Sequence, residues 1–386
     1  MSLKIGAGQL VPTFRVMDVI RAANERAACQ APHAPKILRL EVGQPSSGLP
    51  SGARQAVEAA LQSGDPLGYT EVLGRLSLRT RLSQHIRDWY GADISPARIA
   101  VTIGASAAFP LAFLSCFEQG DKVALAAPYY PPYYNILVAL GLEPVVLPCG
   151  IETGFQPSVE MLKALPESPA GLILASPANP TGSMLAPEAL EALCRYCDEA
   201  GIRLISDEIY HGLTFGKKQV SASQYSENAV IINSFSKYFS MTGWRVGWAI
   251  FPENLIRVAE RLAANLFISA PYVSQVAAEA ALDCREELEE RRADYATARQ
   301  IVINGLRDAG FHHFSPPDGA FYVYVDIENR APDSAAFCSR LLAEQGIATT
   351  PGLDFDAARG GRYFRLSYCA ELSDIKDAME RMKQMG

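Results

Sequence analysis

Short apolar runs alternate with longer amphipathic stretches between residues 99 and 236, and this alternation limits the fold more than any other feature. Such runs, separated by stretches of helical period, indicate parallel strands joined by crossover helices, one of them at Pro187–Ala200. Several runs are apolar on both faces, as a sheet covered by helices on each side requires. We therefore predict a doubly wound α/β layer with strands at Ile99–Ile103, Lys122–Ala126, Glu143–Leu147, Gly171–Ala175, Arg203–Ser206 and Val230–Asn233.

The character of the sequence changes after Asn254, where long stretches of helical period rich in Ala, Glu and Arg begin. Further on, Ala320–Ile327 and Tyr363–Tyr368 have the pattern of strands, and Ser334–Gln345 has that of a helix. These elements predict a smaller α+β unit, against which the N-terminal segment also packs. A chain of 386 residues is, in addition, too long for one ordinary core. We expect a large domain at residues 46–282 and a small domain formed by residues 1–45 and 283–386.

The charge and hydropathy of the chain argue against several classes of protein. The formal net charge is −7, and no run of Lys or Arg offers the electropositive surface that nucleic acids or anionic lipids require. No segment has the roughly eighteen uninterrupted apolar residues of a membrane span, and the N-terminus lacks the apolar stretch of a signal peptide. We expect a cytoplasmic protein that binds small molecules and protein, with no nucleic acid and no membrane.

The cysteines and histidines do not predict a metal site. The 8 cysteines are spread along the chain without the density of a disulfide scaffold, so we expect reduced thiols. Cys194 and Cys197 form a C-x-x-C inside a predicted helix with no second pair nearby, which favours helix packing over metal or redox chemistry. His312 and His313 are adjacent and point in different directions, which favours a turn before a strand over a ligand pair.

Polar side chains follow three of the predicted strands, at the point where each strand ends. Residues 176–182 (SPANPTG), 207–210 (DEIY) and 234–237 (SFSK) occupy these positions. Open α/β sheets bind ligands at the carboxyl ends of their strands, so one ligand could contact all three segments.

Ten short sequence motifs occur along nearly the whole chain. Each motif alone is weak evidence for a protein family, but their occurrence together in this order is specific. They are Gly43-Gln-Pro45, Tyr69-Thr70, Gly104-Ala-Ser106, Pro128-Tyr-Tyr-Pro131, Asn179-Pro-Thr-Gly182, Ser206-Asp-Glu-Ile-Tyr210, Ser234-Phe-Ser-Lys237, Gly243-Trp-Arg245, Gly319-Ala-Phe-Tyr322 and Arg365-Leu-Ser. With these motifs the chain resembles the fold-type-I enzymes that depend on pyridoxal 5′-phosphate (PLP), within the class I/II aminotransferase family of the aspartate aminotransferase superfamily. The resemblance implies PLP as cofactor, a large domain with a mainly parallel sheet covered by helices, a smaller α+β domain, and a homodimer with shared active sites.

The resemblance implies that Lys237 carries PLP as a Schiff base and transfers protons during catalysis. Its amine must be neutral to attack, which requires a partly desolvated and cation-rich surrounding that lowers its pKa. The alternative is a solvated loop lysine. The flanking Ser-x-Ser and the following Arg245 favour the catalytic reading.

By the same resemblance, Asp207 pairs with the pyridine nitrogen of the cofactor, and Tyr210 and Asn179 hydrogen-bond its 3′ oxygen. Lys237, Asp207 and Tyr210 are then the catalytic residues. A helix N-cap is the alternative for Asp207, and a plain Asn-Pro turn is the alternative for Asn179.

A phosphate group favours a helix N-terminus, hydroxyls and one fixed cation. The resemblance assigns it to Gly104, Ala105, Ser106, Ser234, Ser236 and Arg245. The first three precede a helical segment predicted at residues 107–117, so backbone amides there can point at an anion. A structural salt bridge is the alternative for Arg245, which lies between two apolar residues.

Two tyrosines complete the implied cofactor site. Tyr69 matches a residue that reaches the phosphate of the neighbouring subunit. Tyr130 matches the ring that stacks on the pyridine, although the adjacent Tyr129 is the alternative.

The substrate carboxylate is assigned by resemblance to Arg365, with Asn179 and the backbone of Gly43. A planar guanidinium suits a carboxylate, and an unpaired Arg inside a strand pattern would be costly. The nearby Arg362 is expected to face solvent.

The implied reaction is ping-pong transfer of an amino group between an amino acid and a 2-oxo acid through Lys237. A carbon–sulfur β-lyase on the same scaffold is the alternative, because the same motifs serve both reactions. A non-catalytic PLP-binding regulator domain is disfavoured, since the motifs leave no room ahead of Gly43 for a DNA-binding module and the chain is acidic.

The donor is not fixed by the motifs. Residues 44–48 (QPSSG) depart from the acidic form common in relatives, and no basic residue stands near Ser106, which weakens an assignment to aspartate. Phe14 and Arg15 are candidates for specificity, with a surface turn as the alternative.

Overall fold

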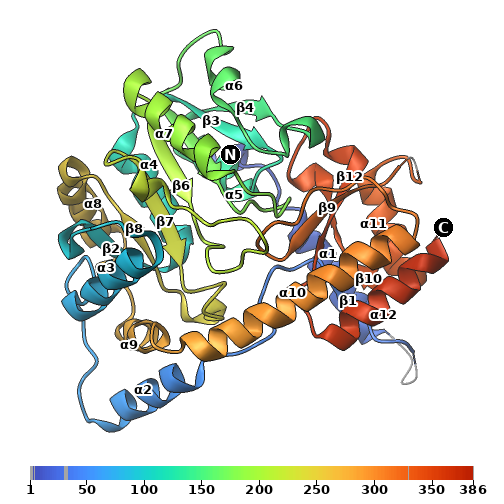
Figure 1. Cartoon of the computed structure of the whole chain (residues 1–386), viewed down its shortest axis with the longest axis horizontal. Coiled ribbons are helices and arrows are strands. Elements are labelled where there is room, and N and C mark those ends of the chain that lie inside the picture. Colours follow the sequence, from blue (N-terminus) through green and yellow to red (C-terminus); the bar gives the residue numbers. More distant parts are fainter. Residues whose placement is uncertain (1–2, 4, 30–33, 329, 386) are drawn as a thin grey trace.

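The computed structural model describes residues 3, 5–29, 34–328 and 330–385. At its centre is a seven-stranded sheet with helices on both faces (Figure 1), in the strand order β2-β8-β7-β6-β5-β3-β4. The strands are β2 (Ile99–Thr102), β3 (Lys122–Ala127), β4 (Glu143–Pro148), β5 (Gly171–Ala175), β6 (Arg203–Asp207), β7 (Val230–Ser234) and β8 (Gly247–Ile250).

The predicted α/β layer is confirmed. Each of the predicted strands is present and ends within a residue of its expected bound, and β7, β6, β5, β3 and β4 run parallel. The strand missed by the sequence analysis is β8, which lies antiparallel between β2 and β7. It is 4 residues long and begins with glycine, too short a run to show strand alternation.

Both faces of the sheet are apolar because successive side chains of each strand point to opposite sides. Val123, Leu125, Ile173 and Ile205 belong to one core with the inner face of helix α4, whereas Ala124, Leu172 and Leu204 belong to the other core with α7. Because helices cover both faces, the polar residues gather at the carboxyl ends of the parallel strands.

The helices that pack around this sheet are α2 (Ser51–Gln62), α3 (Leu76–Tyr90), α4 (Gly104–Cys116), α5 (Pro131–Ala139), α6 (Val159–Lys163), α7 (Pro187–Ala200), α8 (Glu253–Leu266) and α9 (Tyr272–Ala281). Helix α7 has the predicted bounds. Helix α4 begins at Gly104 rather than at Ala107 as expected, because Gly104 takes a φ of +67° that ends the preceding strand at once. The amides of residues 105 and 106 are therefore in the first turn of the helix.

A second, smaller group of elements lies beside the sheet, and the long helix α10 (Arg285–Asp308) runs from one to the other (Figure 1). Its strands form a three-stranded sheet in the order β11-β12-β9 and a two-stranded sheet in which β1 pairs with β10. The elements are α1 (Val16–Ala28), β1 (Leu38–Arg39), β9 (Tyr322–Asp326), α11 (Ser334–Gln345), β10 (Ile347–Ala348), β11 (Thr350–Pro351), β12 (Tyr363–Ser367) and α12 (Leu372–Met382). The N-terminal β1 thus pairs with a strand more than three hundred residues away. The residue bounds given above for two domains stay a prediction.

The cysteines and the paired histidines have the surroundings expected of structural residues. All cysteines carry free thiols, and Cys194 and Cys197 are buried on α7, where burial raises the pKa of both. His312 and His313 are exposed in an irregular segment whose backbone amides donate to Glu328. Among the described residues, no group of three or more His, Cys, Asp or Glu side chains could hold a metal ion. The described helices likewise include none long and apolar enough to cross a membrane.

Candidate active site

A cavity of about 290 Å³ lies at the carboxyl ends of the parallel strands, between the large sheet and the smaller group of elements. Its walls come from segments that are far apart in the sequence. They include the residues after β5 and β6, the loop after β7, the first turn of α4, the N-terminal helix α1 and strand β12. The topology thus brings together the three polar segments predicted to share one ligand.

Lys237 is partly buried in this cavity and its ammonium group has few polar partners. Its Nζ donates to the carbonyl of Gly43 at 2.6 Å, and the rings of Tyr210 and Phe321 each lie 5.9 Å away. Burial lowers the pKa of Lys237 to about 8, with the nearby Arg365 lowering it further and Cys369 acting in the opposite direction. About one-tenth of this amine is therefore neutral at pH 7, far more than for a solvated lysine, and the neutral form is the one that a nucleophile or general base requires.

Asp207 lies at the end of β6, beneath the same cavity, and is almost wholly buried. Its Oδ1 accepts from the backbone N–H of Ile209 at 3.1 Å, and its Oδ2 accepts a short hydrogen bond from the hydroxyl of Tyr133. Burial raises the pKa of Asp207 to about 6, although both hydrogen bonds pull it down. A cation placed above this carboxylate would be strongly stabilised, since so little water competes for it.

Tyr210 and Asn179 face the cavity from two neighbouring turns. The hydroxyl of Tyr210 lies 3.0 Å from that of Tyr322, and burial raises the pKa of Tyr210 well above its usual value. Asn179 Oδ1 accepts from Arg365 Nη1 at 2.9 Å. Since the oxygen of this amide is occupied, its NH₂ group is the donor left for a ligand.

Arg245 lies beside the first turn of α4 and lines the cavity, as Arg365 also does. Its Nη1 donates to the carbonyl of Thr242 at 2.9 Å, and its Nη2 lies 3.4 Å from Ser106 Oγ. A Cβ on Gly104 would lie only 2.5 Å from Arg245 Nη2, so glycine is needed there for the close approach as well as for its positive φ. Arg245 has no carboxylate partner among the described ion pairs, which leaves its charge available to an anion.

The two serines before Lys237 have different places. Ser236 lines the cavity, whereas Ser234 lies behind it, with its hydroxyl 2.9 Å from Ser236 Oγ and 3.2 Å from the carbonyl of Val246. Ala105 lines the cavity beside Ser106, and both lie in the first turn of a 13-residue helix. Amides, hydroxyls and one guanidinium therefore converge on one end of the cavity.

Arg365 is buried at the other end, on β12. Its Nη2 donates to the carbonyl of Glu41 at 2.5 Å, and its guanidinium stacks on Tyr322 and Phe355 at 4.6 Å and 4.8 Å. Its Nε is buried without a hydrogen-bond partner. A buried guanidinium that is held by neutral groups and keeps an unused donor is suited to bind a carboxylate.

Gly43 is required by a close approach rather than by a turn. A Cβ at this position would lie 1.6 Å from the hydroxyl of Tyr322, so any side chain would displace that ring.

The two adjacent tyrosines, Tyr129 and Tyr130, have different surroundings. Tyr130 lines the cavity, whereas Tyr129 stacks on Tyr134 with ring centroids 5.7 Å apart.

The N-terminal segment closes the far side of the cavity with apolar side chains. Phe14 packs edge-on against Tyr130, with ring centroids 6.4 Å apart, and Val16, Met17 and Ile20 of α1 also line the cavity. Arg15 is exposed and contributes its backbone N–H to Asp354 instead.

Three predicted site residues do not line this cavity. Gly104 and Ser234 lie next to residues that do, whereas Tyr69 points into solvent, with a side chain that is 84% exposed. The sequence analysis did not name several residues that line the cavity, among them Tyr133 and Tyr322. Tyr322 lies within a quoted motif, and Tyr133 follows the Pro128–Pro131 motif, but nothing in the sequence shows that a ring from α5 bonds to Asp207.

Comparison with known proteins identifies the class to which this fold and cavity belong. The aminotransferase class I and II family model matches residues 35–382. The chain is 46% identical to the valine–pyruvate aminotransferase of Mycobacterium tuberculosis and 33% identical to the (5-formylfuran-3-yl)methyl phosphate transaminase of Methanocaldococcus jannaschii, covering 96% of each chain in both cases. Among solved structures, it is similar to an aminotransferase from Mycobacterium tuberculosis (TM-score 0.96, 44% identity, 99% of each chain). It is also similar to the aspartate aminotransferase of Thermus thermophilus with maleate (TM-score 0.93, 29% identity, 100% of each chain).

The fold and the matches define a PLP-dependent transferase of nitrogenous groups. The chain belongs to the class I and II aminotransferase family. The predicted family, fold, cofactor and general activity are thereby confirmed, and the choice left open between a transferase and a lyase falls to the aminotransferase.

Proposed function

We propose that this aminotransferase uses Lys237 as its catalytic base and takes amino acids with small apolar side chains as donors, with pyruvate as the acceptor. The observation that carries the donor class is the apolar wall of the cavity, formed by Phe14, Val16, Met17 and Ile20. The relative named as a valine–pyruvate aminotransferase supports the same pairing of substrates.

The residues of the cavity match the needs of PLP one by one. A phosphate group fits between the first turn of α4 and Arg245, whose guanidinium has no carboxylate partner among the described ion pairs. Asp207 would pair with a protonated ring nitrogen, and Asn179 and Tyr210 would donate to the 3′ oxygen of the cofactor. Tyr130 would cover one face of the ring.

When bound, PLP supplies an electron sink for the charge that develops on the substrate Cα. Lys237 Nζ would take the proton from Cα and return it to C4′ of the cofactor. Burial lowers the pKa of Lys237 to about 8, so about one-tenth of this amine is neutral at pH 7, against far less for an ordinary lysine. Asp207 would hold the ring nitrogen in its cationic form, because separating the pair would leave a charge buried without a partner. The same proton transfer in reverse serves the second half-reaction.

Arg365 would fix the α-carboxylate of every substrate, donor or acceptor. Asn179 holds one end of its guanidinium and the Glu41 carbonyl holds the other, so the plane of the group is set before a substrate enters. This preorganisation places Cα near Lys237 without further ordering of side chains.

We also propose a homodimer in which Tyr69 reaches the phosphate site of the partner subunit. The side chain of Tyr69 is 84% exposed, so it is free to reach a neighbouring subunit, and the resemblance assigns it to the phosphate there. The hydroxyl of a tyrosine in this position could add one further donor to the phosphate.

The test of the donor class is a panel of amino acids assayed with pyruvate and with 2-oxoglutarate. Valine and alanine should react with a higher kcat/KM than aspartate or lysine, because an apolar wall cannot satisfy a buried charge. Ile20→Gln should lower kcat/KM for valine by about tenfold while changing alanine much less. Leu61→Gln, at an exposed position on α2, is the matched control and should change neither. Faster turnover of aspartate than of valine by the unaltered enzyme would refute the proposal.

A further inference from the structure

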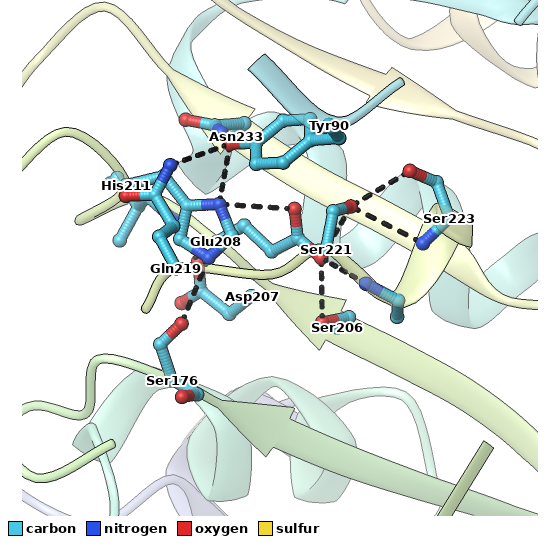
Figure 2. A network of polar contacts seen from close by, with 12 residues as sticks. Tyr90, Ser176, Ser206, Asp207, Glu208, His211, Gln219, Ser221, Ser223 and Asn233 are labelled. Atoms are coloured by element: carbon cyan, nitrogen blue, oxygen red, sulfur yellow. Dashed lines mark hydrogen bonds and ion pairs between the residues drawn. The ribbon is translucent and has the colours of Figure 1, made fainter. Parts of the chain in front are cut away.

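A buried polar network lies at the carboxyl end of β6, next to residues that line the cavity (Figure 2). At its centre is His211, which follows Tyr210 in the chain and is 3% exposed. It also includes Tyr90 at the end of α3, Gln219, Glu208 and the backbone of Ser176. None of these groups takes part in the chemistry proposed above.

The direction of every hydrogen bond through His211 follows from its partners. The carbonyl of Ser176 can only accept, so His211 Nε2 carries the proton and donates across 3.0 Å. Nδ1 of a neutral ring is then an acceptor, and the hydroxyl of Tyr90 donates to it at 2.6 Å. Tyr90 in turn accepts from Gln219 Nε2 at 3.1 Å, and Gln219 Oε1 accepts from the N–H of Gly212 at 2.6 Å. The chain of donors therefore runs without a break from Gly212 to Ser176 (Figure 2).

The electrostatics of the network keep this direction fixed. Burial lowers the pKa of His211 to about 3, so the ring stays neutral across the physiological range. Glu208 Oε2 lies 3.4 Å from His211 Nδ1, but Glu208 Oε1 is bonded separately by Ser206, Ser221 and the N–H of Ala222. Burial raises the pKa of Glu208 to about 7, and neutral His85 is the other titratable group that acts on the ring. The His211 ring itself therefore carries no charge, and its contribution is geometric.

The two ends of the bond from His211 to Ser176 belong to the two turns that face the cofactor site. Ser176 begins the turn after β5 that carries Asn179, and His211 is adjacent to Tyr210 in the turn after β6. We propose that His211, oriented by Tyr90, is a positioning residue that fixes the distance between these turns and so aligns Asn179 and Tyr210 on the 3′ oxygen of the cofactor. This inference rests on the proposed roles of those two residues.

A rigid link is effective here because the alternatives are costly. Without the imidazole, the Ser176 carbonyl would lose its donor and the Tyr90 hydroxyl would lose its acceptor, and the turns would have to shift to restore these hydrogen bonds. A shift of about 1 Å is enough to misalign a hydrogen bond to a ligand. Hydrogen-bond donors to the 3′ oxygen draw electron density away from the imine nitrogen that joins the bound cofactor to Lys237. They thereby lower the pKa of that nitrogen. Loss of their alignment should raise that pKa.

The experiment compares holoenzymes of His211→Leu, His211→Gln and Tyr90→Phe with the unaltered enzyme. Two quantities are measured: the pKa of the visible absorbance of the bound cofactor, and the Kd for PLP of the apoenzyme. His211→Leu should raise the pKa by about one unit and weaken PLP binding about tenfold, since one net hydrogen bond corresponds to about that factor. His211→Gln can still donate to Ser176 and should restore most of both quantities. Tyr90→Phe should move both in the same direction as His211→Leu, by less.

The control separates positioning from general stability. Ser83 lies on the same helix as Tyr90, and its buried hydroxyl donates to the carbonyl of Ile94 at 2.6 Å. Ser83→Ala should lower the Tm of the apoenzyme without changing the absorbance pKa. If His211→Leu lowers the Tm but leaves the absorbance pKa and the Kd at their original values, His211 is only a structural residue and the inference is wrong. Failure of the proposed function is a separate result, because then the unaltered enzyme would lack a Lys237-dependent visible band.

Discussion

Removal of the Tyr133 hydroxyl is the perturbation whose size can best be worked out from the structure. Tyr133 donates a short hydrogen bond to Asp207 Oδ2, and its ring packs on Phe109 at 5.1 Å, so Tyr133→Phe deletes the donor and keeps the packing. A hydrogen bond to a charged group contributes ~1.5–3 kcal/mol, which corresponds to about one to two pKa units.

The sign of the change follows from the protonation equilibrium of Asp207. Its pKa is about 6, so the carboxylate is ionised above that pH and is lost as the pH falls through it. Without the Tyr133 hydroxyl the pKa should rise to about 7–8. A cationic ring nitrogen beside Asp207 lowers the pKa in both proteins, and the difference between them remains.

The assay is kcat/KM as a function of pH for the two holoenzymes. The acid limb of the Tyr133→Phe profile should lie about one to two pH units above that of the unaltered enzyme. One pH unit above the midpoint of the unaltered enzyme, the ionised fraction of Asp207 should then fall from about nine-tenths to between about half and one-tenth, so activity should fall about two- to tenfold. Near pH 9 the two enzymes should differ little. Tyr134→Phe, which changes a ring stacked on Tyr129, is the matched control on the same helix. An equal loss at every pH, or no shift of the acid limb, would refute this account of Asp207.

Three further predictions concern binding and assembly. Arg365→Lys should raise KM for donors and acceptors alike by about 10-fold or more, because a single ammonium cannot bond Asn179, Glu41 and a carboxylate in one plane; an unchanged KM for both would contradict this. Gly43→Ala should lower both Tm and activity, because the new Cβ would lie 1.6 Å from the Tyr322 hydroxyl; a Tm equal to that of the unaltered enzyme would show that the ring moves freely. Tyr69→Phe should weaken PLP binding a fewfold without dissociating the dimer, measured by PLP titration and by mass in solution; a monomeric unaltered enzyme would reject the shared site.

The sequence was most informative where physical requirements are local. The parallel strands could be predicted because they are apolar on both faces and lie between helices, and the segments 176–182, 207–210 and 234–237 could be placed together because parallel strands end at one edge. The start of α4 was placed three residues late, since the positive φ of Gly104 is a backbone feature that its residue type permits but does not require.

The remaining features depend on contacts between distant segments. The bond from Tyr133 to Asp207, the approach of Tyr322 to Gly43 and the wall that Met17 and Ile20 add to the cavity all join residues from separate elements. The His211 network is of the same kind. Its hydrogen bonds join Tyr90 at the end of a helix, two turns and Gln219, and no sequence pattern links these segments. Periodicity and motif spacing report on one element at a time, so such contacts have no signal in a single sequence.

The central claim is that the buried amine of Lys237 is the attachment point of the cofactor. The direct measurement is to incubate the protein with PLP, reduce it with borohydride, digest it and locate the added mass by peptide mass spectrometry. The account predicts stoichiometric modification of Lys237, together with loss of the visible band and of turnover in Lys237→Ala while the fold is retained. Modification of another lysine in its place, or normal turnover by Lys237→Ala, would contradict it.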